Sequence, residues 1–367
     1  MLKYVCSRDF CKTGTGVICM PTIKEIAKAS NVSVATVSNV INGKGRASEE
    51  TKKAVLKVIE ELNYTPNYVA KNLKMKSTRS IGVIAEDMTV FDMPDIIDGI
   101  TECCEKEDYQ ILLVNLRLYK KYEDQYYRDN RHREEVHRVI DKLRAKQVEG
   151  IIYVSAHERL IDVIPEDMPI PVVVAYGFTN KAEIPSVVVN DLQGAEKLVN
   201  YLIDCGHKKI GVIAGKKESV HTQSRLEGYQ RALFAGGILY DPGLVLYGEW
   251  DRESGYKHTD ILLNAGCTAI FCMNDFMAGG TYDRLNERGI QIGGDIAVVG
   301  FDNREMASYG KPPLTTMELP LDDIGYKASR LILEALQKKG LEKAESAHYM
   351  DCRLIVRESV NKVLEPK

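Results

Sequence analysis

The stretch TIKEIAKASNVSVATVSNVING, residues 22–43, predicts two short helices joined by a tight turn. Thr22 and Glu25 form a capping box, in which each side chain can satisfy a free backbone amide of the other residue at the start of a helix. Ser33 can cap the second helix, and Gly43 stops it. Apolar residues of this second helix recur at three- and four-residue spacing, which indicates one buried face. That face comprises Val34, Val37, Val40 and Ile41.

A third helix is expected to begin at Ser48, with Glu49 and Glu50 at its positive end. The second helix consists mostly of small or β-branched residues, which are poor helix formers, so packing of its valines has to supply its stability. Small side chains let a helix approach DNA bases closely, and Ser and Thr hydroxyls reach phosphates. The three helices therefore predict a DNA-binding module, with a purely structural module as the alternative. The expected buried face of the third helix comprises Val55, Leu56, Val58, Ile59 and Leu62.

The charge of the chain is distributed unevenly. Residues 20–79 carry eleven Lys and Arg against five Glu, a net +6, and residues 1–19 add +2. Because the whole chain of 367 residues has a formal charge of −3, the residues from 80 onward carry −11. A small basic head on a large acidic body indicates one module for an anionic polymer and a second module with another task.

The composition, 44% hydrophobic and 28% charged, predicts a globular protein of two or three domains. No run of 18 apolar residues occurs and the N-terminus lacks the pattern of a secretory signal, so a cytoplasmic protein without a membrane partner is expected. Nine cysteines without framework spacing fit reduced thiols, and neither a metal ion nor a cofactor is expected.

Residues 22–73, TIKEIAKASNVSVATVSNVINGKGRASEETKKAVLKVIEELNYTPNYVAKNL, resemble the N-terminal headpiece of the LacI/GalR family of bacterial transcriptional repressors. Many members of that family carry Arg at the position of Asn39. Because Arg suits guanine and Asn suits adenine, this departure leaves the preferred base at that position open. The resemblance implies that bases in the major groove are read by Val34, Ala35 and Asn39. It implies phosphate contacts at Thr22, Ser33, Thr36, Ser38 and Asn42.

The stretch YTPNYVAKNLKMKST, residues 64–78, occupies the place of the hinge of that family, which becomes a short helix on the operator. Pro66 is placed to start this helix. The resemblance implies that Leu73 of each subunit wedges between central base pairs from the minor groove and kinks the DNA. It also implies that Asn67, Ala70 and Lys74 lie against the groove. A leucine that only packs within an amphipathic linker is the alternative.

From residue 80 onward, buried apolar segments alternate with helical stretches, which predicts parallel sheets wound with helices. The fold class is therefore α/β, and the segments resemble the bilobal periplasmic-binding-protein-like core of the same family, with two doubly wound parallel sheets. Residues 312–320 and 350–359 return to the sheets late in the chain. The expected strands lie within residues 80–86, 109–115, 148–155, 170–176, 208–215, 242–248, 268–275 and 296–302.

These patterns set expected domain boundaries. Residues 1–19 form a non-native or disordered extension, 20–65 the helix-turn-helix domain, 66–79 the hinge and 80–360 the core. One lobe is expected to comprise about residues 80–177 plus 315–345, and the other 178–314 plus 346–360. Residues 116–147 are longer and more charged than a usual connection, and a solvated helix is favoured there over a surface contact or a part of the pocket rim.

Ligands of doubly wound lobes bind beyond the carboxyl ends of the strands, which here lie in the cleft between the lobes. Arg225 matches the arginine of the family that binds sugar hydroxyls or a carboxylate, and Trp250 falls where members stack an aromatic ring on the effector. Asn274 and Asp302 supply polar groups at adjacent strand ends. A structural cap is the alternative role for each of these side chains. Weaker candidates from the first lobe are Asp87, Phe91, Asp92 and Tyr176.

The sequence thus predicts a homodimeric DNA-binding regulator, with a tetramer as an alternative, in which a small effector switches affinity for a pseudo-palindromic operator. A repressor controlled by a sugar or sugar derivative is expected. A corepressor, either a purine or a protein, is the alternative. A soluble solute-binding protein is disfavoured by the headpiece, and an enzyme is disfavoured because no nucleophile, base and orienting acid form a recognisable set.

Overall fold

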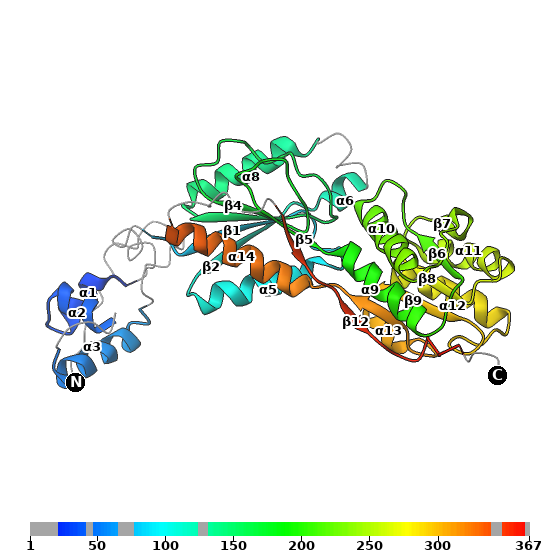
Figure 1. Cartoon of the computed structure of the whole chain (residues 1–367). Coiled ribbons are helices and arrows are strands. Elements are labelled where there is room, and N and C mark those ends of the chain that lie inside the picture. Colours follow the sequence, from blue (N-terminus) through cyan, green and yellow to red (C-terminus); the bar gives the residue numbers. More distant parts are fainter. Residues whose placement is uncertain (1–20, 42–46, 65–76, 124–130, 339–346, 364–367) are drawn as a thin grey trace. The chain divides into compact units, whose positions relative to one another are not determined.

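The computed structural model describes residues 21–41, 47–64, 77–123, 131–338 and 347–363. The chain divides into two compact units, Met1–Thr78 and Arg79–Lys367 (Figure 1). Both the helical first unit and the α/β second unit agree with the predicted fold class. None of the helices in the described part of the chain is long and apolar enough to span a membrane.

The first unit contains α1 (Ile23–Ala29), α2 (Val34–Ile41) and α3 (Glu49–Glu61). One fully buried side chain from each helix, Ile26, Val37 and Val55, meets the others in a small core. The predicted faces are partly wrong, because Val34, Leu56 and Leu62 are 42%, 54% and 38% exposed. Three helices of this length enclose little volume, so the apolar positions at the edge of each face stay in contact with solvent.

The predicted helix starts are confirmed by hydrogen bonds. The Glu25 carboxylate accepts hydrogen bonds from the amide of Thr22 at 2.6 Å and from its hydroxyl at 3.1 Å. Ser33 Oγ accepts from the Thr36 amide at 3.1 Å, and Ser48 Oγ accepts from the Thr51 amide at 3.2 Å. The three bonds with amide donors each satisfy a backbone group at a helix start, and the bond from the Thr22 hydroxyl holds the Glu25 carboxylate in place.

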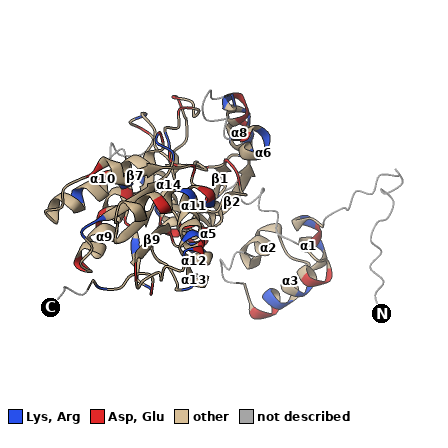
Figure 2. Ribbon diagram, turned by 90° about the vertical axis from the view of Figure 1, so that its right-hand side faces the viewer, with Lys and Arg blue, Asp and Glu red and all other residues tan. Residues whose placement is uncertain are grey.

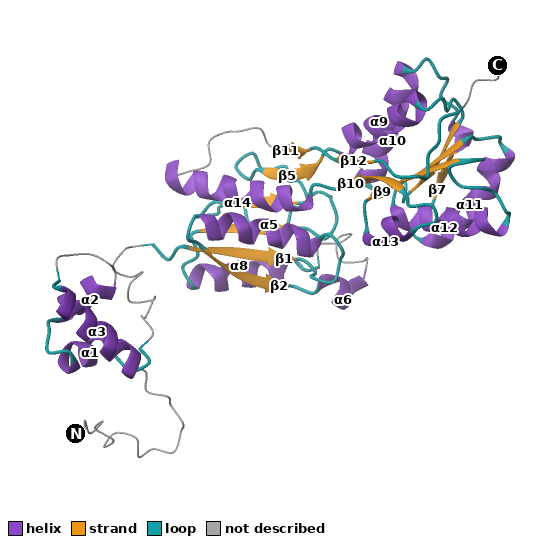
Figure 3. Cartoon of the chain, turned by 90° about the horizontal axis from the view of Figure 1, so that it is seen from below, coloured by secondary structure: helices purple, strands orange, loops and turns teal. Residues whose placement is uncertain are grey.

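The first sheet of the second unit is entirely parallel, with strand order β11-β5-β4-β3-β1-β2. Helices α5 (Met93–Lys106) and α14 (Leu321–Lys338) cover one face, and α8 (Arg133–Ala145) covers the other (Figure 3). Alternate residues of each strand therefore enter different cores. The strands are β1 (Ser80–Ala85), β2 (Gln110–Asn115), β3 (Gly150–Val154), β4 (Val172–Ala175), β5 (Ser186–Val189) and β11 (Ala347–Met350).

The second sheet has strand order β12-β10-β9-β8-β6-β7, and only β12 runs antiparallel to its neighbour. Its strands are β6 (Ile210–Ala214), β7 (Val245–Tyr247), β8 (Ala269–Cys272), β9 (Ala297–Asp302), β10 (Thr315–Glu318) and β12 (Arg353–Ile355). Its helices are α9 (Asp191–Asp204), α10 (Val220–Ala235), α11 (Arg252–Asn264), α12 (Asp275–Glu287) and the short α13 (Glu305–Tyr309). A 3-10 turn, η3 (Pro242–Leu244), precedes β7.

The boundaries between the lobes differ from the expected ones. The chain crosses from one sheet to the other after β5, between β10 and α14, and between β11 and β12. Residues 186–189 and 347–350 therefore belong to the first lobe, and 315–318 to the second. Apolar segments of three or four residues carry no signal that assigns them to one of two similar sheets, which explains the misplacement.

The charged segment 116–147 is divided between two helices. It contributes α6 (Leu118–Tyr122) and, after residues outside the described ranges, α8. Helix α8 is solvated on one side only, because Val136, Val139, Ile140 and Leu143 are buried against the first sheet. This is the ordinary crossover between two parallel strands rather than an added feature.

Candidate functional site

Helix α2 forms an uncharged, solvent-facing surface on the first unit. Its sequence VATVSNVI contains no Lys, Arg, Asp or Glu, and Figure 2 shows it without charged residues, whereas α1 and α3 carry both signs. The side chains of Val34, Ala35 and Asn39 are exposed on it. Ser33 and Thr36 hydroxyls bond each other at 2.9 Å at the start of this helix. The predicted contacts Asn42, Asn67, Ala70, Leu73 and Lys74 lie outside the described residues.

The centre of the second unit contains a buried ion-pair network around Arg225. This side chain, 3% exposed, projects from α10, and its Nε donates to Asp191 Oδ1 at 2.6 Å. Its Nη1 donates to the Met273 carbonyl and lies 3.8 Å from Asp302 Oδ1. The guanidinium carbon lies 3.8 Å from the centre of the Phe301 ring. Arg225 is therefore fixed in place before any ligand binds.

Three members of this network were missed by sequence reasoning. His221 Nδ1 lies 2.5 Å from Asp191 Oδ2, and its ring centre lies 5.7 Å from that of Tyr176. Glu158 accepts a hydrogen bond from the Val189 amide at 3.1 Å. The signal for His221 was its place four residues before Arg225, on the same face of a helix. Asp191 follows β5, which sequence reasoning also missed.

Burial and the ion pairs act in opposite directions on the pKa values of this network. Burial raises the pKa of Glu158 to about 7, because a charged carboxylate is costly in a dry interior and Asp191 lies nearby. Burial acts to lower the pKa of His221, but the adjacent Asp191 carboxylate outweighs it and raises that pKa. The pKa of Asp191 is lowered despite burial, because Arg225 and His221 stabilise its charge.

Trp250 and Asn274 hold each other at the edge of the network. Asn274 Nδ2 donates to the Trp250 carbonyl at 2.9 Å, and Asn274 Oδ1 accepts from the Met277 amide at 2.8 Å as the cap of α12. A Cβ atom on Gly215 would lie 2.0 Å from the Trp250 ring, so this glycine lets the ring pack on the backbone. Both polar groups of Asn274 thus bind within the protein. This is the role of a structural cap, which the sequence offered as the alternative to ligand contact.

Asp302 ends β9 with a backbone φ of 110°, a conformation that a non-glycine residue rarely adopts. Tyr176 and Trp250 also have positive φ, at 57° and 65°. Such backbone outliers are held only where the surrounding structure fixes them, and they gather at binding sites. Burial raises the pKa of Asp302, against the opposing effect of Arg225.

The first lobe presents Asp92 to this network. The residue is 1% exposed and precedes α5, but its carboxylate makes no capping bond. Among the described residues, no donor of another residue reaches either of its oxygens, and only its own backbone amide acts on the carboxylate as a hydrogen-bond donor. Burial raises its pKa to about 8, and His221, Asp302 and Arg304 are the nearest charged influences. This carboxyl group is therefore buried without a partner, which is uncommon in folded proteins.

Two other candidates from the first lobe have partners. Asp87 Oδ1 accepts from the Thr89 amide at 2.9 Å and from its hydroxyl at 2.6 Å, which closes a local turn. The Phe91 ring lies 3.6 Å from the guanidinium carbon of Arg304, and Phe276 lies 4.2 Å away from that carbon. Arg304 thus stacks between one aromatic ring of each lobe, in cation–π geometry.

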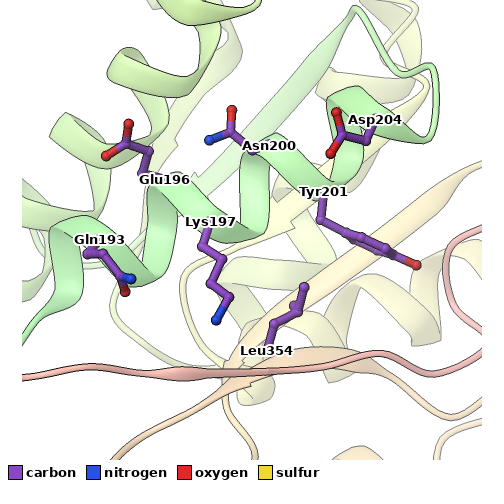
Figure 4. Close-up of a pocket in the computed structure, with 7 residues that line it drawn as sticks. All are labelled: Gln193, Glu196, Lys197, Asn200, Tyr201, Asp204 and Leu354. Atoms are coloured by element: carbon purple, nitrogen blue, oxygen red, sulfur yellow. The ribbon is translucent and has the colours of Figure 1, made fainter.

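A groove of about 900 Å³ opens beside Arg304 and Asp302 and runs along the crossings between the lobes. Its lining contains more acidic than basic side chains. The basic ones are Arg304 and Arg353, and the acidic ones are Asp95, Asp302, Glu305, Glu318, Asp322, Asp323 and Asp351. A second hollow lies on α9 (Figure 4). Six of its seven lining residues come from that one helix, with Leu354 as the exception, so it is a helix face rather than a cleft.

Glu158, Asp191 and His221 have the ligand types of a metal centre, with ligand atoms within 4.8 Å of one another. However, both oxygens of Asp191 already bind His221 and Arg225. Ligand atoms 2.0–2.2 Å from one ion normally stand about 3 Å apart, whereas His221 Nδ1 and Asp191 Oδ2 are 2.5 Å apart. The arrangement is that of a hydrogen-bonded ion pair.

A three-helix unit with an exposed, uncharged second helix, followed by a two-lobed α/β core, defines a helix-turn-helix transcription regulator with a periplasmic-binding-protein-like core. Residues 22–67 match the bacterial regulatory proteins of the lacI family, and 199–360 match the periplasmic binding protein-like domain. The chain belongs to the lacI family of bacterial regulatory proteins.

Individual relatives align over nearly the whole chain. The HTH-type transcriptional repressor PurR of Vibrio campbellii is 33% identical, covering 94% of this chain and 100% of the relative. The lac repressor dimer bound to operator and the anti-inducer ONPF is 26% identical, with a TM-score of 0.73, covering 94% of this chain and 100% of that one. The transcriptional regulator CelR in complex with cellobiose is 26% identical, with a TM-score of 0.60, covering 92% and 99%.

Proposed function

We propose that this lacI-family repressor binds a pseudo-palindromic operator as a homodimer and is controlled by a small effector held between its lobes. The observation that carries the proposal is the buried network in which Asp92 and Tyr176 of the first lobe face His221, Arg225 and Asp302 of the second. A ligand that bridges the two lobes favours one lobe arrangement and can thereby bias operator affinity.

Operator recognition is assigned to α2. Its exposed Val34, Ala35 and Asn39 offer two small apolar side chains and one amide, which suit thymine methyl groups and adenine. The solved lac repressor dimer on its operator supports two such helices that read two half-sites. Residues 66–79 are proposed as the hinge, with Leu73 as the wedge in the minor groove.

The effector is proposed to be a small polar molecule related to a sugar. Arg225 and Asp302 supply a donor and an acceptor, and Trp250 supplies an aromatic edge, which is the combination that sugar hydroxyls and ring faces require. The cellobiose complex of CelR supports this class. A purine corepressor is the second candidate, favoured by the relatives named PurR. A purine ring stacks with apolar surface on both of its faces, whereas the buried carboxyl group of Asp92 makes this site polar.

Operator binding is tested by selecting DNA from a random library with the full-length protein. We expect a pseudo-palindrome, bound far more tightly than random DNA, with affinity that falls steeply as salt increases. Asn39→Ala is expected to lose about 1–3 kcal/mol on the selected operator and little on random DNA. Equal affinity of the parent for selected and random DNA would refute sequence-specific regulation.

A further inference from the structure

We propose that the effector of this cleft carries a protonated amino group, which binds at the carboxylate of Asp92. The inference rests on the proposed function, because it names the chemical class of the ligand of that same site. It narrows the class from polar molecules in general to amino sugars and other small hydroxylated or aliphatic amines.

The first argument is the state of Asp92 itself. Its side chain is 1% exposed, and no donor of another described residue reaches Oδ1 or Oδ2, so that its own backbone amide is the only donor that acts on it. Although Asp92 precedes α5, its carboxylate does not bond the free amides of that helix. A buried carboxylate without donors is destabilising, so folding alone gives no reason to keep one here. A ligand that donates to it supplies the missing partner.

The second argument is the charge around Asp92. The groups that face it are His221 and Arg304, which are basic, with Asp302 and Tyr176. His221 is already paired with Asp191, and Arg304 stacks between Phe91 and Phe276. With Arg225, whose Nη1 lies 3.8 Å from Asp302 Oδ1, the site has three basic groups. They face the four carboxyl groups of Asp92, Glu158, Asp191 and Asp302, so carboxyl groups are in excess by one. A positively charged nitrogen is complementary to that excess, whereas an anionic effector would add to it.

The acid-rich groove adds a path for such a ligand. Asp302 belongs both to its lining and to the buried network, and Phe91, the neighbour of Asp92 in the chain, also lines it, so the groove lies beside the network. Seven acids against two arginines along its lining raise the local concentration of cations. The 2.5 Å contact between His221 and Asp191 leaves no room for a metal ion between those two residues.

The raised pKa of Asp92, about 8, adds a signature that a neutral ligand would not give. At neutral pH much of the empty protein holds this carboxyl group protonated, so an ammonium group has to displace a proton as it binds. Amine affinity is therefore expected to rise between pH 6 and pH 8, as long as the amine stays protonated. His221, Asp302 and Arg304 face the same carboxyl group and act on the same titration.

The test compares matched probes on the full-length protein by calorimetry and thermal shift. Glucosamine is set against glucose and N-acetylglucosamine, and 1,4-diaminobutane against 1,4-butanediol. Asp92→Asn removes the charge while keeping the shape, and Asp98→Asn is the control on an exposed position of the same helix. We expect at least one amine to bind about tenfold more tightly than its neutral partner, and this preference to vanish in Asp92→Asn alone.

Several results would overturn the inference: no amine binds, a neutral partner binds as tightly as its amine, or the preference survives in Asp92→Asn. Operator titrations repeated in the presence of each probe distinguish a failure of this inference from a failure of the proposed function. If a neutral sugar binds and changes operator affinity, effector control stands and the amine inference fails. If an amine binds at Asp92 without any change in operator affinity, the amine preference of the site stands but control of operator binding by that ligand fails.

Discussion

Glu86 and Asp92 are two buried carboxylates of the first lobe, six residues apart, in opposite states. Glu86 is fully buried and accepts two hydrogen bonds from Arg159, at 2.7 and 2.9 Å, one from the Tyr153 hydroxyl at 2.6 Å and one from the Ala156 amide at 2.9 Å. Asp92 is equally buried and has no donor from another described residue. These partners lower the pKa of Glu86 to about 2 despite burial, whereas burial raises that of Asp92 to about 8.

The difference shows that the Glu86 carboxylate stabilises the fold, whereas the Asp92 carboxylate does not. The donors that bind Glu86, on Tyr153, Ala156 and Arg159, belong to the first lobe itself. The charged groups nearest Asp92 come from the second lobe and leave its oxygens without a bond. Burial alone therefore does not identify a binding residue, but burial without partners does point to one.

The largest effect is expected for Glu86→Ala. Removing the carboxylate leaves Arg159, whose side chain is 16% exposed, without its bidentate partner. We expect a loss of about 3–5 kcal/mol in the free energy of unfolding, measured by urea titration at pH 7. Because the folded pKa is about 2 and the ordinary value is 4.5, the stabilisation is present above about pH 4.5 and is lost as the pH falls towards 2. A loss below 1 kcal/mol would show that this network contributes no more than an exposed pair.

Asp92→Asn is expected to act in the opposite direction and to stabilise the protein by about 1–3 kcal/mol at pH 8. The folded pKa of about 8 exceeds the ordinary 3.8, so the cost of the carboxyl group grows as the pH rises from about 4 to 8. The gain in the variant should accordingly vanish near pH 4. Thermal unfolding at both pH values measures it, and an equally stable or less stable variant at pH 8 would contradict the unpartnered state.

Arg304→Ala is expected to cost about 0.5–2 kcal/mol, because it removes a cation that stacks on Phe91 and Phe276. The same change removes a positive charge that lowers the pKa of Asp92, so that pKa should rise further. Carboxyl chemical shifts followed by NMR against pH measure the shift. An unchanged titration of Asp92 would show that Arg304 does not act on this site.

The smallest effect is expected for Asp283→Asn, which breaks the pair with Arg252 on the surface of the second lobe. Its two hydrogen bonds, at 2.5 and 2.6 Å, match those of Glu86 in geometry, but the side chains are 41% and 52% exposed. Solvent screens such a pair, and a loss below about 1 kcal/mol is expected. Equal losses for this variant and Glu86→Ala would mean that burial does not set the strength of these pairs.

Much of the fold was predictable from local signals. Helix starts at Thr22, Ser33 and Ser48 depend on short-range capping, which a sequence displays directly. The eight expected apolar segments each contain a strand of the structure, β1 to β4 and β6 to β9. Strand β5 was missed because residues 186–189 are few and merge with the helix that follows. Residues 347–350, which form β11, were not predicted as a strand and fell within the range expected for the second lobe, although β11 pairs with β5 of the first.

The site was less predictable, because its character depends on partners from distant parts of the chain. Arg225 and Asp302 were named from their places in the sequence, and the structure brings them within 3.8 Å. Asp92 was a weak candidate, since no local pattern tells a capping aspartate from one that lacks donors. His221 and Glu158 became candidates only when folding placed them beside Asp191.

The three crossings between the lobes have a mechanical consequence. The first and second crossings each separate β5 and α5 from their partners β11 and α14: β11 pairs with β5, and α14 packs so closely on α5 that a Cβ on Gly99 would lie 2.0 Å from the Asp322 carbonyl. A protease that cuts either of these two crossings therefore yields two fragments that stay joined through a shared sheet and helix pair, and a cut at the third leaves β12 paired with β10. Such a nicked protein should elute as one particle and separate only in denaturant, so an intact elution profile does not report an intact chain.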